Sequence, residues 1–145
     1  MSHIDALLQC VDEQSALLND FIQTLEAEGA LLLETPSDEA LAALTTRKND
    51  YARRLAELDQ ARAAALAGLG HADDRAGIEA ACADRPDLHA AFDTLFERVE
   101  QASALNQTNG QILKTFMDHN QQALDTLRGL MGQDLYDARG RLSKK

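Results

Sequence analysis

The stretch that decides the fold is residues 84–131, which read DRPDLHAAFDTLFERVEQASALNQTNGQILKTFMDHNQQALDTLRGLM. Apolar and small polar side chains recur in it at alternating steps of four and three residues, the spacing of a coiled-coil seam. The seam positions are Leu88, Phe92, Leu95, Val99, Ala102, Asn106, Asn109, Leu113, Phe116, Asn120, Ala123 and Leu127. Asp84 can cap the start of a helix, and Pro86 falls in its first turn, where a missing N–H group costs nothing. The pattern predicts one very long amphipathic helix.

Two further helical segments precede this stretch. The first runs from about His3 to Leu33, and its apolar stripe is wide enough for more than one neighbouring helix. A short turn follows, in which Thr35 can act as the N-cap of the second helix and Pro36 can be its first residue. Because a short loop between long helices favours antiparallel neighbours, residues 3–69 are predicted to form a hairpin.

The distribution of charge supports this hairpin. The chain has no Lys or Arg before residue 47, so its first arm is acidic. The second arm carries several basic residues, and we expect their side chains to face the acidic first arm. They are Arg47, Lys48, Arg53, Arg54 and Arg62.

These segments together predict an all-α fold. We expect an elongated antiparallel helical bundle or coiled coil of three long helices, with a short connecting helix and a flexible C-terminal tail. Residues 1–132 would form a single elongated helical domain, with a connector at 70–84 and the long helix at 85–131, and residues 133–145 would form the tail. At ~1.5 Å per residue the long helix would span roughly 65–70 Å. It would outrun the hairpin, leaving apolar surface partly uncovered on its last turns.

The composition excludes several classes of function. A formal net charge of −10 disfavours nucleic acid, whose binding depends on Lys and Arg that neutralise phosphates, and it disfavours an anionic membrane surface for the same reason. Apolar runs are too short to span a membrane, and the N-terminus lacks the features of a secretory signal. We therefore expect a cytoplasmic protein without membrane insertion.

Candidate residues for catalysis or metal binding form no recognisable set. The four His and two Cys residues lack the paired spacing of a zinc site, and no phosphate-binding loop or nucleophile motif is present. We expect no metal, no cofactor and no enzymatic activity.

Two polar features have alternative interpretations. Asn106, Asn109 and Asn120 occupy positions of the predicted seam, where asparagine can fix the register of packed helices at a cost in stability. The alternative is a polar notch at which a partner helix docks. Tyr136 lies in a polar, glycine-flanked segment, and it either folds back on the bundle or belongs to a short motif that another protein binds.

The chain resembles the FlgN family of flagellar type III export chaperones over nearly its full length. The specific parts are Asn106-Gln107-Thr108-Asn109-Gly110 in the long helix and Tyr136-Asp137-Ala138-Arg139-Gly140 near the C-terminus. The resemblance implies a cytoplasmic chaperone whose clients are the hook–filament junction (hook-associated) proteins. It would bind their terminal helical region, keep them unassembled and deliver them to the type III export gate.

The resemblance also implies roles for particular residues. Tyr136 would dock the loaded complex onto the cytoplasmic domain of the export gate protein FlhA. The client would bind an apolar face of the long helix formed by Leu113, Phe116, Met117, Leu124, Leu127 and Met131. The alternative to a chaperone is a structural coiled-coil protein whose long helix closes an obligate homo-oligomer.

Overall fold

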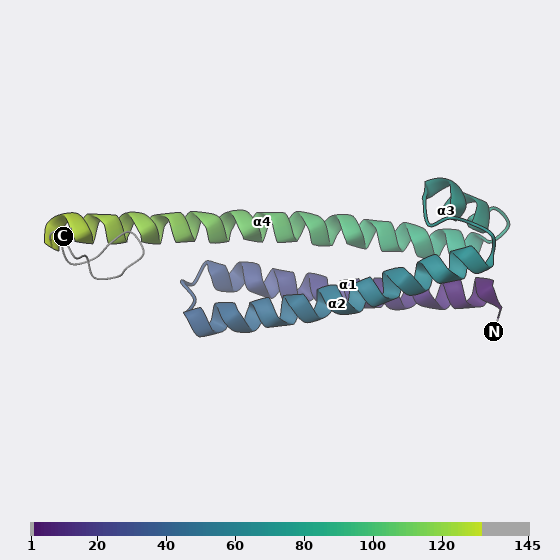
Figure 1. The fold of residues 1–145 in the computed structure, drawn as a ribbon, viewed down its shortest axis with the longest axis horizontal. Helices are drawn as coiled ribbons and strands as arrows, with labels where there is room; N and C mark the ends of the chain where they lie inside the picture. The colour runs from purple at the N-terminus through teal and green to yellow at the C-terminus, as the bar shows by residue number, and fades with distance from the viewer. Residues whose placement is uncertain (1, 132–145) are drawn as a thin grey trace. The chain divides into compact units, whose positions relative to one another are not determined.

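The computed structural model describes residues 2–131, without the side chains at positions 116, 119, 120, 123, 124, 127, 128, 130 and 131. This part of the chain forms four α-helices and no strand (Figure 1): α1 (His3–Leu32), α2 (Asp38–Gly68), α3 (Arg75–Cys82) and α4 (Pro86–Met131). The predicted all-α fold of three long helices and a short connecting helix is confirmed.

The chain divides into two compact units, Met1–Asn109 and Gly110–Lys145, and the division falls inside α4. The first unit holds α1, α2, α3 and the beginning of α4. The second contains the rest of α4, described as helix to Met131. The single domain expected for residues 1–132 stays a prediction, and the expected tail at 133–145 lies outside the described residues.

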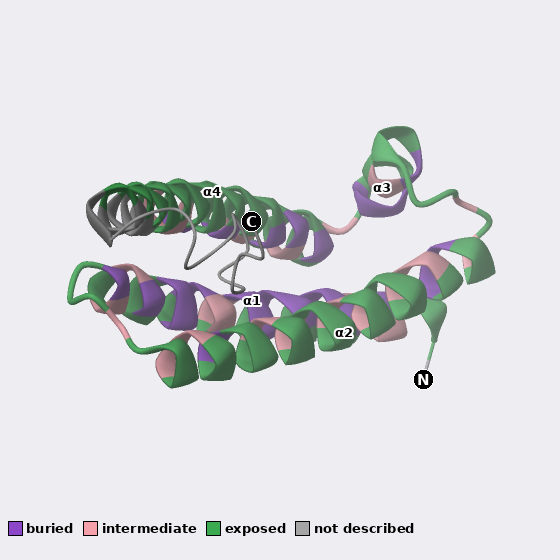
Figure 2. Cartoon of the chain, turned by 60° about the vertical axis from the view of Figure 1, so that its left-hand side comes forward, coloured by how far each residue is buried: buried purple, intermediate pink, exposed green. Residues whose placement is uncertain are grey.

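Helix α1 is the central element of the first unit. It buries twelve residues along its length, whereas α2 buries only Leu44, Ala65 and Leu66. Figure 2 shows this contrast, with buried residues along the length of α1 and an α2 that is largely exposed. The core takes side chains from all four helices: Leu7, Val11, Leu18, Ile22 and Leu25 from α1, Ala65 and Leu66 from α2, Ala81 and Cys82 from α3, and Leu88, Phe92, Leu95 and Ala102 from α4.

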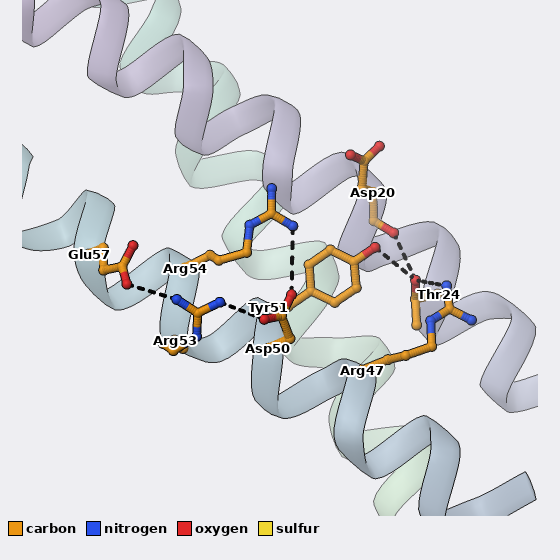
Figure 3. Close-up of polar contacts among 8 residues, drawn as sticks. All are labelled: Asp20, Thr24, Arg47, Asp50, Tyr51, Arg53, Arg54 and Glu57. Carbon is orange, nitrogen blue, oxygen red and sulfur yellow. Dashed lines mark hydrogen bonds and ion pairs between the residues drawn. The ribbon is translucent and has the colours of Figure 1, made fainter.

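Helices α1 and α2 form the predicted antiparallel hairpin. The Cys10 thiol donates to the Leu58 carbonyl oxygen at 3.3 Å, and Lys48 Nζ lies 3.3 Å from a carboxylate oxygen of Glu28. As residue numbers rise along α1, the residue numbers of the contacting partners in α2 therefore fall, which is the antiparallel arrangement. Between these two contacts, the hydroxyl groups of Thr24 and Tyr51 are 3.3 Å apart (Figure 3).

The basic residues of α2 differ from expectation, because most of them do not pair with acids of α1. Arg53 forms ion pairs with Asp50 at 2.6 Å and Glu57 at 3.0 Å, all within α2 (Figure 3). Residues three and four apart on a helix are already neighbours, so these partners are closer than those across the hairpin. In the described part of the chain, only Lys48 forms an ion pair between the two arms, with Glu28.

The start of α2 corrects the predicted cap. Ser37, not Thr35, is the N-cap, and its side-chain oxygen accepts from the Ala40 N–H at 3.2 Å. Thr35 instead has a φ of 55°, a left-handed conformation that β-branched residues seldom adopt. The chain must reverse direction within a few residues after Leu32, and this turn moves the helix start beyond Pro36.

The start of α4 also differs from the prediction, which placed its cap at Asp84. Its first residue is Pro86, and the Arg85 carbonyl oxygen accepts from the His89 N–H at 3.0 Å, so the flanking residue is Arg85 rather than Asp84. The Arg85 guanidinium forms an ion pair with Asp87 at 2.8 Å. This hydrogen-bonded partner lowers the pKa of the Asp87 carboxyl to about 2.

The buried stripe of α4 departs from the predicted seam at two positions between Leu88 and Asn109. Leu88, Leu95, Ala102 and Asn109, spaced by seven residues, are buried as expected. The second row of the stripe lies three residues after these positions, at the half-buried Ala91, Arg98 and Leu105. Val99, four residues after Leu95, is 45% exposed. Phe92 is 2% exposed and buried as predicted, so among the seam positions from Leu88 to Asn109 only Val99 and Asn106 lie outside the buried stripe.

Candidate functional site

The six residues predicted to bind a client all lie in α4, within the unit Gly110–Lys145. At about 100° per residue, their positions fall on one face of the helix. Leu113 is half-buried, and Met117 is 61% exposed, so a large apolar side chain on this face is open to solvent. The side chains of Phe116, Leu124, Leu127 and Met131 are outside the described set.

Tyr136, predicted to dock on the export gate, lies outside the described residues, as does the whole motif that surrounds it. Its role stays a prediction from the resemblance.

Of the two seam asparagines whose side chains are described, Asn109 is the better connected. Its side chain is 4% exposed, and its amide nitrogen donates to the Leu25 carbonyl oxygen at 2.7 Å and to Glu28 Oε1 at 2.9 Å. A Cβ atom at Gly29 would lie 3.0 Å from Asn109 Oδ1, so the glycine leaves room for the amide. Asn106, by contrast, is exposed and outside the buried stripe. The side chain of Asn120 is outside the described set.

These contacts join three helices through one carboxylate. Glu28 is 7% exposed, and it accepts from Asn109 of α4 and from Lys48 of α2 at 3.3 Å. A buried carboxylate is costly unless it is paired and hydrogen-bonded, and both conditions are met here. We name Asn109, Glu28 and Lys48 the polar cluster. It holds α1, α2 and α4 in one register at the last residue of the first unit.

The described residues show no chemistry of a reactive site. Among them, no three His, Cys, Asp or Glu side chains are grouped so that they could hold a metal ion. Cys10 and Cys82 are free thiols, and burial raises the pKa of each, which disfavours the nucleophilic thiolate. No helix in the described part is long and apolar enough to cross a membrane.

Sequence reasoning missed a groove between α3 and the start of α4. It has a volume of about 770 Å³, and Ile78, Phe92 and Phe96 line it. In the sequence, residues 70–84 carry only the weak signal of a short alanine-rich piece, which predicts a connector and no groove. The usable signal was Phe92 and Phe96, which are four residues apart and so share a helix face.

Comparisons with known proteins agree over nearly the whole chain. The family model described as FlgN protein matches residues 1–144. The chain is 26% identical over 138 residues to the protein named "Flagella synthesis protein FlgN" of Salmonella typhimurium, and equally to that of Escherichia coli K12. Each alignment covers 94% of this chain and 90% of the relative. No solved structure matches the chain.

Proposed function

Because this chain belongs to the FlgN family, we propose that it is a cytoplasmic flagellar export chaperone that acts by binding and not by catalysis. Its clients are hook–filament junction proteins, whose terminal helical region it binds. It keeps them unassembled and delivers them to the cytoplasmic domain of the export gate protein FlhA. The observation that carries the proposal is the family match over residues 1–144, together with relatives named as flagella synthesis proteins.

The client-binding face is proposed to be that of Leu113, Phe116, Met117, Leu124, Leu127 and Met131 on α4. Support comes from their shared helical face and from Met117, whose side chain is 61% exposed. Amphipathic helices bind other helices through rows of apolar residues at this spacing, and unbranched Met side chains adapt to partners of different shape.

The first test is complex formation in solution. Size-exclusion chromatography with light scattering is run on the full chain, alone and mixed with a hook–filament junction protein. A stable complex of about one-to-one composition supports the chaperone. A tight homodimer that ignores the client favours the structural coiled coil and contradicts the proposal.

The client-binding face is tested by the double variant Leu124→Asp and Leu127→Asp. Two charges in an apolar interface should weaken client binding at least about tenfold, because central apolar contacts carry most of the binding energy. The matched control is Thr115→Asp with Gln122→Asp, which adds the same charge at exposed positions on the opposite side of α4. Calorimetric titration measures both. Equal affinities for the two variants would place the client elsewhere.

The gate-docking role is tested by Tyr136→Ala. This variant should fold and bind the client normally, while its client complex binds the cytoplasmic domain of FlhA at least about tenfold more weakly, as expected when an aromatic hot-spot residue is removed. Tyr136→Phe keeps the ring and should retain most of the affinity if the ring makes the contact. Loss of folding or client binding together with gate docking would contradict a specific role.

A further inference from the structure

The groove between α3 and α4 belongs entirely to the first unit, and it exposes apolar surface. Figure 1 shows α3 beside the first turns of α4, and side chains of both helices line the groove. The rings of Phe92 and Phe96 lie 5.8 Å apart, and Phe96 remains 47% exposed. Val99 is 45% exposed and lies three residues after Phe96, hence on the same side of α4. Two large apolar side chains therefore lie next to each other in solvent.

The groove is formed before any partner arrives, because α3 is held in place from several sides. Asp74 caps α3 by accepting from the Gly77 N–H at 2.7 Å. Arg62 of α2 donates to both carboxylate oxygens of Asp73 at 3.2 Å. A Cβ atom at Gly77 would overlap the carbonyl oxygen of Ala72, so the backbone there is closely packed. A preformed groove spares a ligand the cost of ordering its binding site.

The charge around the groove is negative. Its lining includes five carboxylates, two arginines and one histidine, His89, whose Nδ1 lies 3.1 Å from Asp93 Oδ2. Both arginines are already occupied, since Arg62 pairs with Asp59 and Asp73 and Arg75 pairs with Glu79. Glu100 forms no ion pair with any described residue. The carboxylates are Asp73, Asp74, Glu79, Asp93 and Glu100. Neighbouring acids in excess over bases favour a cationic ligand.

We propose that this groove is a docking site for an amphipathic helix of another protein, with apolar residues on one face and Lys or Arg at its edges. The apolar face covers Phe96 and Val99, and the basic edges meet the acidic rim at Asp93 and Glu100. Binding of an amphipathic helix in an apolar groove is a common mode of protein recognition. The site is separate from the client-binding face proposed on residues 113–131, so the chaperone would have two independent contact surfaces.

The test uses a fluorescently labelled helical peptide of about eighteen residues, with Leu on one face and Lys at the edges, and the full-length protein. Anisotropy should report saturable binding that weakens as salt is raised, because exposed charges are screened. Phe96→Asp and the double variant Asp93→Lys with Glu100→Lys should each lower the affinity at least about tenfold. Circular dichroism checks that both variants keep the helical content of the wild type.

Two controls separate the groove from the overall negative charge. Asp12→Lys with Glu34→Lys makes the same change of net charge at exposed positions away from the groove, and it should change the affinity less than about twofold. Met117→Asp removes an exposed apolar side chain of the other unit and should also have little effect. A peptide with Glu in place of Lys should bind at least about tenfold more weakly.

Three results would overturn the proposal. The wild type could fail to bind the basic peptide, or the control pair could lose as much affinity as the groove pair, which would assign the attraction to net charge. Light scattering could also show a dimer that Phe96→Asp converts to a monomer. In that case a second copy of this chain would cover the groove.

Discussion

Asn109 shows how one polar side chain can organise a helical core. Four buried positions of α4 recur every seven residues, and three of them are apolar. The fourth is Asn109. Its amide reaches its hydrogen-bond partners only if Leu25 and Glu28 of α1 lie at the same level as Asn109 along the helix axes. An apolar residue would pack equally well after α4 slides by one turn, whereas the amide would lose its partners. Buried polar groups of this kind specify register more than they add stability.

We expect Asn109→Ala to lower the free energy of unfolding by about 1–3 kcal/mol, because it removes two buried hydrogen bonds and leaves Glu28 with Lys48 alone. Urea denaturation measures the change. The control is Asn106→Ala, three residues away on the same helix but exposed. It should change the stability by less than about 0.5 kcal/mol. Equal losses from the two variants would show that the buried hydrogen bonds of Asn109 contribute nothing measurable.

At the level of elements, the turn between α1 and α2 places its cap after the proline. Ser37 has an extended backbone, with φ −72° and ψ 161°, and its hydroxyl accepts from the Ala40 N–H. Asp38 and Glu39 follow in the first turn, where negative charge favours the positive end of the helix dipole. The start of α2 is therefore stabilised by three consecutive residues.

Replacement of the cap tests this assignment. Ser37→Ala should lower the free energy of unfolding by about 1 kcal/mol, a typical value for loss of an N-cap. Thr35→Ala should produce no comparable loss, since Thr35 caps nothing and its left-handed backbone suits alanine no worse than threonine. Thermal denaturation of both variants provides the measurement. A larger loss of stability for Thr35→Ala than for Ser37→Ala would indicate that Thr35 is the cap.

Helix existence and order could be predicted from the sequence, because apolar spacing and turn residues act locally. The three long helices, the hairpin and the short helix within residues 70–84 all appear. The exposure of Val99 and Asn106 could not be predicted, because it depends on where α1 lies relative to the row at Leu88 and Leu95. The groove at Ile78 and Phe96 was missed for a similar reason, since it exists only once α3 folds against α4.

The candidate site, like the fold, could be predicted only in part from the sequence. Helical spacing places Leu113, Met117 and Leu124 on one face without any structure. It could not reveal that Asn109 rather than Asn106 reaches into the core, because both fit a seam of alternating steps.

At the level of the whole molecule, the core formed by the described side chains belongs to the first of the two units. The apolar core cluster ends at Ala102, with Leu105 packed against it, and the polar cluster follows at Asn109. No described side chain of the unit Gly110–Lys145 belongs to the apolar core cluster. Stability and the proposed client binding are thus assigned to different parts of the chain.

Truncation tests this separation. A chain of residues 1–115 should melt within about 5 °C of the full chain, because it keeps every residue of the described core cluster and one further helical turn after Asn109 to limit fraying. A chain of residues 1–84 lacks Leu88, Phe92 and Leu95, and it should lose cooperative unfolding. Calorimetry compares the three proteins. A large loss of stability in residues 1–115 would mean that the second unit supports the first.

The central position of α1 has a consequence for how the chain is made. The ribosome produces the central helix first, and the helix that covers its second side last. At roughly 5–20 residues per second, residues 70–109 require about 2–8 seconds of translation. During that interval the nascent hairpin leaves one side of α1, including the turn at Leu25 that later meets Asn109, without its partner. Vulnerability to aggregation during synthesis is therefore determined by the order of the helices along the chain, whatever the stability of the finished bundle.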